Sequence, residues 1–146
     1  MLKGIPSILS PELLKILMEM GHGDVLLIGD GNYPHASGAK KGNCEFVRLD
    51  GHGVPEILDA ILKLMPLDTY VETPVTLMEV VPGDPVETPI WDEYAKIVEK
   101  HQPGTKIRHM ERFAFYEEAK KCYAIVTSGE TALYANIMLQ KGVVVE

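Results

Sequence analysis

The sequence is poor in cysteine, in positive charge and in long apolar runs. Its two cysteines, Cys44 and Cys122, are far apart and lack a spacing typical of metal ligands, and one disulfide would be a poor framework for 146 residues. We therefore expect two reduced thiols in a cytoplasmic protein. The 14 Lys and Arg residues are outnumbered by 21 Asp and Glu residues, so the formal net charge is −7. This balance argues against a nucleic-acid partner, because phosphate backbones are bound by clustered cations.

The apolar runs are too short for a membrane protein. The longest, such as residues 25–28 and 75–78, fall far short of the ~20 residues that span a bilayer. The N-terminal segment has no continuous apolar stretch and no small-residue cleavage site, so we expect neither a membrane anchor nor a secretion signal. With 46% hydrophobic residues the chain can bury a full core, and its length suits one domain over residues 1–146.

The motifs of common cofactors and metals are absent as well. Residues 29–34 begin like a dinucleotide-binding fingerprint, but Pro34 stands where the third glycine belongs, and the segment is expected to open a loop rather than a helix. The sequence has no Walker loop, no nucleophile elbow, no His-Glu-x-x-His pair and no Cys-x-x-Cys pair. We therefore predict neither a cofactor nor a metal site.

Hydrophobic periodicity predicts alternating helices and strands. Ser10 and Pro11 are typical of a helix start, apolar residues then recur at helical spacing, and Gly21 ends the pattern. The pattern indicates an α/β fold, a single three-layer domain whose helices pack on a central, mostly parallel or mixed sheet. The expected helices are 11–20, 55–65, 90–100 and a short one within 113–122; the expected strands are 25–28, 45–49, 75–81, 106–110, 123–127 and 134–139; residues 32–43 are an expected loop.

Two polar residues flank the first expected strand and are candidates for a ligand site. Asp30 follows the strand, and in an open α/β sheet ligands bind in the crevice beyond the carboxyl ends of strands. His22 lies between two glycines and precedes the strand, so it can approach Asp30 only if the loops curl or a second subunit contributes. Taken alone, His22 is equally well a capping or surface histidine, and Asp30 a turn carboxylate bonded to its own loop.

Four blocks of sequence carry a more specific indication. They are Ser-Pro-Glu-Leu-Leu at 10–14 through Met-Gly-His-Gly-Asp at 20–24, followed by Asp30 and Pro34; Leu-Asp-Thr-Tyr at 67–70; Glu-Arg-Phe-Ala-Phe-Tyr-Glu at 111–117; and Thr-Ser-Gly-Glu at 127–130 through Tyr-Ala-Asn-Ile at 134–137. In this order, and over nearly the whole chain, they resemble the family of L-fucose mutarotase and D-ribose pyranase. The third block is similar to the fucose branch, because the pyranase branch tends to have a histidine near Arg112 and lacks the aromatic run.

The resemblance implies a cofactor-independent isomerase that interconverts the α and β anomers of a free sugar such as L-fucose. It implies His22 as the proton donor and Tyr116 as a second acid/base group, with no metal. It also implies a homo-oligomer, decameric in bacterial members of the family and smaller in animal members, with sites near subunit boundaries. The residues that the resemblance places on the sugar are Asp30, Asp68, Arg112, Tyr134 and Asn136.

The chemistry of mutarotation agrees with these residue types. Opening a pyranose ring requires a proton delivered to the ring oxygen and a proton removed from the anomeric hydroxyl, so two proton-transferring groups are the minimum. Histidine is the side chain suited to either transfer near neutral pH. Three alternatives stay open: a D-ribose pyranase, a non-catalytic monosaccharide-binding protein, and a metal-dependent hydrolase, which no ligand spacing supports.

Overall fold

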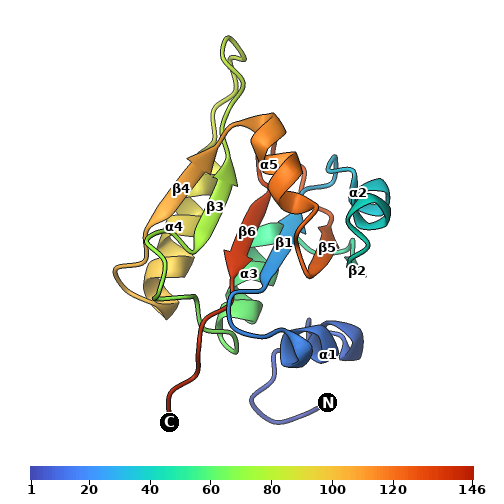
Figure 1. Ribbon diagram of the computed structural model, residues 1–146, viewed down its shortest axis with the longest axis vertical. Coiled ribbons are helices and arrows are strands. Elements are labelled where there is room, and N and C mark those ends of the chain that lie inside the picture. The colour runs from blue at the N-terminus through green and yellow to red at the C-terminus, as the bar shows by residue number, and fades with distance from the viewer.

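Helices and strands alternate along most of the chain in the computed structural model, which describes residues 1–146 (Figure 1). The α/β class predicted from the sequence is confirmed. No helix combines the length and the apolar composition that crossing a membrane requires. In chain order the elements are α1 (Pro11–Glu19), β1 (Val25–Gly29), α2 (His35–Gly42), β2 (Glu45–Leu49), α3 (Val54–Leu62), β3 (Val75–Met78), α4 (Pro89–His101), β4 (Ile107–Met110), α5 (Arg112–Ala119), β5 (Ala124–Ser128) and β6 (Ile137–Gln140).

The strands form one mixed sheet in the order β2-β5-β1-β6-β3-β4. The pairs β1 with β5, β5 with β2, and β3 with β4 are parallel, whereas β6 lies antiparallel between β1 and β3. All strands except β6 therefore run in one direction. Their carboxyl ends meet the start of β6 at one edge of the sheet, called here the carboxyl edge. The opposite edge, the amino edge, holds the starts of these strands and the end of β6.

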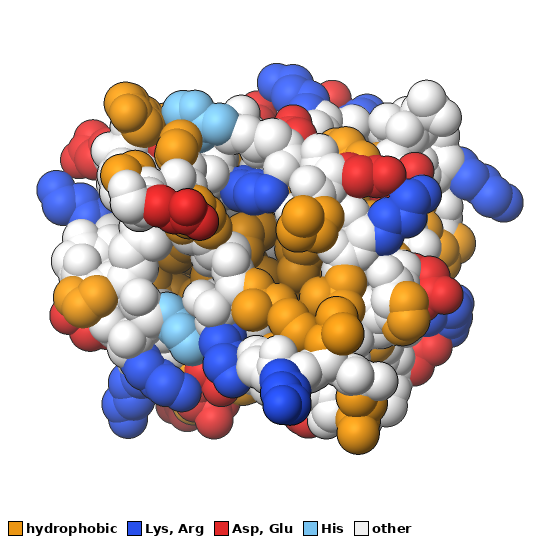
Figure 2. Space-filling model, turned by 90° about the horizontal axis from the view of Figure 1, so that it is seen from below, with side chains coloured by type: hydrophobic (Ala, Val, Ile, Leu, Met, Phe, Trp, Pro, Cys, Tyr) orange, Lys and Arg blue, Asp and Glu red, His pale blue; other side chains and the backbone are white.

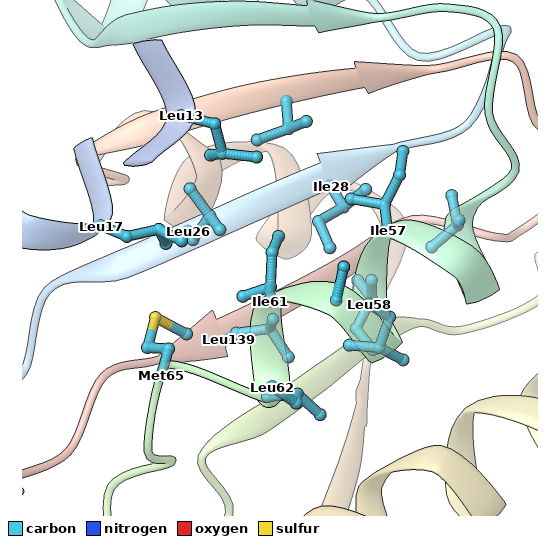
Figure 3. Packing of buried hydrophobic residues seen from close by; sticks show 14 of the residues in the cluster. Leu13, Leu17, Leu26, Ile28, Ile57, Leu58, Ile61, Leu62, Met65 and Leu139 are labelled. Atoms are coloured by element: carbon cyan, nitrogen blue, oxygen red, sulfur yellow. The ribbon is translucent and has the colours of Figure 1, made fainter. Parts of the chain in front are cut away.

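Alternate residues of the central strands point into two apolar cores, one on each face of the sheet. Leu26 and Ile28 of β1 belong to a core of 27 buried residues that α1, α3 and α4 cover, and Figure 3 shows side chains of α1 and α3 meeting those of β1 there. Leu27 faces the other way, into a core of 9 buried residues beneath α2 and α5. Figure 1 shows α5 in front of the sheet and α3 and α4 behind it. The result is the predicted three-layer arrangement.

Side-chain caps explain where two of the helices begin. The Ser10 hydroxyl accepts a hydrogen bond from the Leu13 amide at 3.2 Å, and Pro11 takes the first helical position, as the sequence predicts. The Glu111 carboxylate caps α5 in the same way and accepts from two backbone amides of the first turn at 3.0 Å. Such a cap contributes about 1 kcal/mol. The cap on α5 also fixes the position of Arg112, the first residue of that helix.

One predicted segment is wrong, while the other elements agree with the prediction to within three residues at either end. The expected loop at 32–43 contains α2, which is too short to show helical periodicity because Ala39 is its only buried residue. Asn43 ends this helix with a left-handed φ of 49°. The expected strand at 134–139 begins only at Ile137, because Tyr134 has a φ of 55°, which a strand residue does not adopt.

Candidate active site

Five of the seven residues predicted for the site line one cleft at the carboxyl edge of the sheet. This cleft, called here the edge cleft, has a volume of about 280 Å³. The loops after β1 and β3, the first turns of α5 and the segment before β6 all contribute to it. The sheet topology explains this convergence, because these segments follow or precede strands that end at the same edge. The five residues are Asp30, Arg112, Tyr116, Tyr134 and Asn136.

Asp30 and Asn136 are the most buried polar residues of the edge cleft, with 4% and 5% of their surface exposed. The Asp30 carboxylate accepts hydrogen bonds from the amides of Asn32 (2.9 Å) and Ala135 (3.3 Å), and its own amide donates to Oδ1 of Asn136 at 2.8 Å. Burial raises the pKa of Asp30, and the backbone hydrogen bonds offset part of this rise. Each carboxylate oxygen can still accept from a ligand, and the Asn136 side-chain NH2 group can still donate.

Tyr134 lines the edge cleft in a backbone conformation that is uncommon for tyrosine, with a φ of 55°. Three hydrogen bonds hold it: its hydroxyl donates to Asp84 at 2.6 Å and accepts from the Val81 amide at 3.4 Å, and Nε1 of Trp91 donates to its carbonyl at 2.8 Å. The bond to Asp84, together with burial, raises the pKa of Tyr134. Its hydroxyl oxygen is therefore protonated and retains a lone pair for a ligand.

Helix α5 positions Arg112 and Tyr116 on one face, because they are four residues apart. The Arg112 guanidinium lies 5.8 Å from the centre of the Tyr116 ring and 5.5 Å from that of Phe113. A cation at this distance from aromatic rings is attracted to them. The ring of Tyr33 packs against Tyr116 from the α2 side, with 5.8 Å between ring centres. Tyr116 is thus held between a cation and a second tyrosine.

His22 and Asp68 pair with each other at the amino edge. Nε2 of His22 lies 3.0 Å from Oδ1 of Asp68, which also accepts from the Tyr70 amide at 2.9 Å, while Oδ2 accepts from the Gln140 side chain at 3.0 Å. Although burial acts to raise the pKa of Asp68, these hydrogen bonds lower it overall, so the carboxylate is ionised. The imidazole therefore donates from Nε2. Nδ1 stays free on a side chain that is 45% exposed.

Strand β1 separates this pair from the edge cleft, because His22 precedes the strand and Asp30 follows it. A strand rises about 3.3 Å per residue, so the length of β1 alone keeps the two residues roughly 13 Å apart. The loop does not curl toward the cleft, since it holds His22 against the buried Asp68. Within one chain, the predicted proton donor does not meet the residues of the edge cleft.

The likeness to known proteins covers nearly the whole chain. The model of a family described as the RbsD / FucU transport protein family matches residues 3–144. This chain belongs to that family. The resemblance inferred from the four sequence blocks is thereby confirmed.

Individual members of the RbsD / FucU family are similar to this chain in sequence and in fold. The FucU crystal structure from Bifidobacterium longum is 59% identical, covers 98% of this chain and 100% of its own, and has a TM-score of 0.94. The fucose mutarotase of Streptococcus pneumoniae, solved in complex with L-fucose, is 52% identical over 99% of this chain and 100% of its own, with a TM-score of 0.90. The human fucose mutarotase is 50% identical over 97% of this chain and 94% of its own length.

Five residues that line the edge cleft of this RbsD / FucU member were not predicted from the sequence: Asn32, Tyr33, Met78, Asp84 and Leu133. Asp84 lies in a Pro-Gly-Asp turn after β3, so the strand-end rule that indicated Asp30 also applies to it. Tyr33 could not be found in this way, because its position depends on α2, which lacks a sequence signal. No group of three or more His, Cys, Asp or Glu side chains is arranged to hold a metal ion.

Proposed function

We propose that this protein is an L-fucose mutarotase, a cofactor-independent isomerase that interconverts the α and β anomers of the free sugar. The edge cleft is the observation that carries the proposal. Five residues that the family resemblance implies converge there from separate segments of the chain. The chain is also similar over 99% of its length to a fucose mutarotase solved with L-fucose.

The edge cleft suits a neutral polyol, which needs hydrogen-bond donors and acceptors rather than an opposite charge. Asp30 accepts, while Asn136 and Arg112 donate. Tyr134 accepts through the remaining lone pair of its hydroxyl. Because Asp30 and Asn136 are buried and fixed by the backbone, they bind the sugar with little loss of side-chain entropy.

A second copy of the chain completes the site. Nδ1 of His22 is free at the amino edge, so a neighbouring copy can deliver it to the edge cleft. The amino-edge side of the molecule suits such a contact: Figure 2 looks onto the side where both chain ends lie, and hydrophobic side chains gather across its middle. The exposed large hydrophobic residues of the terminal segments, α1 and the loop after α3 are Met1, Leu2, Met18, Leu64, Tyr70, Val71, Val143, Val144 and Val145.

In the proposed mechanism, His22 and Tyr116 act on opposite sides of the anomeric carbon. His22, in its doubly protonated form, donates the Nδ1 proton to the ring oxygen as the bond from that oxygen to C1 breaks. Tyr116, which must be in its phenolate form for this role, accepts the proton of the anomeric hydroxyl, whose oxygen becomes the aldehyde oxygen. After rotation about the C1–C2 bond, closure on the other face reverses both transfers. Both oxygens of Asp68 already accept hydrogen bonds within the chain, so Asp68 orients the His22 ring rather than binding the sugar.

The assembly and its location follow from the same reasoning. We propose a homo-oligomer, a decamer or smaller, in which each edge cleft receives His22 from a neighbour. We place it in the cytoplasm, in keeping with the free thiols of Cys44 and Cys122. Sedimentation of the purified protein tests the assembly, and a monomer at working concentration would contradict the shared site.

Saturation transfer between the two anomeric protons of L-fucose tests the activity. We expect the protein, at a concentration far below that of the sugar, to raise the exchange rate above its spontaneous value. Exchange that stays at the spontaneous value while L-fucose still binds would instead indicate a non-catalytic sugar-binding protein. The same measurement with D-ribose, following pyranose and furanose signals, would identify a pyranase if ribose is the faster substrate.

A further inference from the structure

A second cleft lies between α2 and α5, directly beside the edge cleft. It has a volume of about 400 Å³ and is called here the helix cleft. Tyr33, Arg112 and Tyr116 line both clefts, so the two spaces adjoin along these three side chains. None of the predicted sugar contacts other than Arg112 lines the helix cleft. The mutarotase site therefore leaves this space unassigned.

The helix cleft is lined by positive charge in a chain whose formal net charge is −7. Lys41, Arg112 and Lys120 face a single acid, Glu117, and that acid pairs with Lys120 at 2.7 Å. Arg112 is held over aromatic rings rather than by a carboxylate. Two cations are thus available to a ligand in a space of limited volume, where an anion binds more strongly than on an open surface.

Neutral donors accompany these cations. Tyr33 is 6% exposed, and burial raises its pKa, so its hydroxyl stays protonated and can donate in the cleft. The start of α2 also contributes to the lining, through Pro34 and Ser37, and no side chain caps this helix end. Uncapped amides and the helix dipole favour negative charge there. Cations, hydroxyls and a helix start are the combination that binds phosphate groups in proteins.

We propose that the helix cleft binds the phosphate group of a sugar 1-phosphate whose ring occupies the edge cleft. This inference rests on the proposed function, because Tyr116 there acts on the anomeric oxygen and lines both clefts. A substituent on that oxygen therefore extends past Tyr116 and Arg112 toward Lys41. The anomeric oxygen of such a ligand has no proton to remove, so the ring cannot open and the compound is a competitive inhibitor.

Three ligands separate the contributions of sugar and phosphate: L-fucose 1-phosphate, the neutral methyl L-fucoside, and inorganic phosphate. Binding is measured calorimetrically, and inhibition by anomer exchange of L-fucose. We expect the 1-phosphate to bind about ten-fold or more tightly than the methyl fucoside, because charge-assisted hydrogen bonds are added. Lys41→Ala should abolish this advantage. Lys40→Ala is the matched control, since Lys40 is an exposed neighbour on α2 that does not line the helix cleft.

Equal binding of the 1-phosphate and the methyl fucoside would overturn the proposal, as would an advantage that survives Lys41→Ala. Inorganic phosphate that binds as tightly as the 1-phosphate would also overturn it, because the sugar would then contribute nothing. Failure of the mutarotase assignment is distinguishable, since the protein would then leave anomer exchange at its spontaneous rate. Tight, Lys41-dependent binding of the 1-phosphate in that case would still support the helix cleft as its phosphate site.

Discussion

A buried carboxylate, that of Asp68, holds the ring of His22 in place. Asp68 is 3% exposed and holds Nε2, which leaves Nδ1 without a partner in the chain on a side chain that is 45% exposed. Tyr70 packs on the same ring, with 5.1 Å between ring centres. An imidazole fixed in this way by a carboxylate is typical of general acid/base catalysis. Burying the Asp68 carboxylate costs free energy, and a histidine with only a structural role would not require it.

His22→Ala is therefore expected to lower the rate of L-fucose anomer exchange by ~10²- to 10⁴-fold, the range typical of general acid/base assistance. Sugar affinity should change little, because the edge cleft itself is intact. Saturation-transfer NMR measures the rate, and calorimetric titration with L-fucose measures the affinity. His52→Ala is the control, since the side chain of His52 pairs with Glu56 at 3.0 Å and lines neither cleft. Equal rates in the two variants would exclude His22 as the proton donor.

The turns at the carboxyl edge hold the strand ends in register. The turn after β5 packs against the turn after β2, where the Gly129 amide donates to the His52 carbonyl at 2.7 Å. The next residue, Glu130, accepts from the amide of Gly31 at 2.8 Å, and so ties this turn to the loop that carries Asp30. The geometry of the edge cleft thus depends on a close approach between backbones.

Gly129→Ala tests this element, because a Cβ there would collide with the carbonyl oxygen of Asp50. We expect a loss of about 1 to 3 kcal/mol in the free energy of unfolding, as for other overpacked sites. Urea denaturation measures it. Gly51→Ala, in a nearby turn where a Cβ would meet nothing within 4 Å, should change stability by no more than about 0.5 kcal/mol. If the two variants had similar free energies of unfolding, the turn would accommodate the Cβ at position 129 without loss of stability.

At the scale of the whole molecule, the two parts of the proposed site lie on opposite edges of one sheet. If two chains share each site, two inactive variants can complement each other in a mixed oligomer. The His22→Ala variant lacks the proton donor at the amino edge but keeps Tyr116. The Tyr116→Phe variant lacks the tyrosine hydroxyl in the edge cleft but keeps His22. A mixed oligomer therefore contains some sites in which an intact His22 meets an intact Tyr116.

Co-expression of the two variants in equal amounts should restore roughly a quarter of the wild-type exchange rate, because one in four pairings at an interface combines both intact parts. Each variant expressed alone supplies the baseline, and the rate is measured per chain by saturation transfer. A mixture no more active than the separate variants, in an oligomer shown by mass spectrometry to contain both, would place the whole site within one chain.

Most of the secondary structure could be predicted, because the responsible signals are local. Ser10 caps α1, prolines begin several helices, and apolar runs mark the buried strands. The exceptions share a physical cause. Helix α2 buries only Ala39, so its stability depends on packing against distant strands, and Tyr134 adopts a left-handed φ that its hydrogen bonds to other segments maintain. Neither property is visible in a local pattern.

Local patterns and the four sequence blocks were thus sufficient for the fold class, the family and the identity of the candidate residues. Strand pairing decides which of these residues lie together. It joins segments more than a hundred positions apart, such as β1 and β6. The direction of the strands brings Asp30, Tyr116 and Asn136 into one cleft. The same directions leave His22 with Asp68 at the other edge, because a strand cannot present both of its ends to the same side of a sheet.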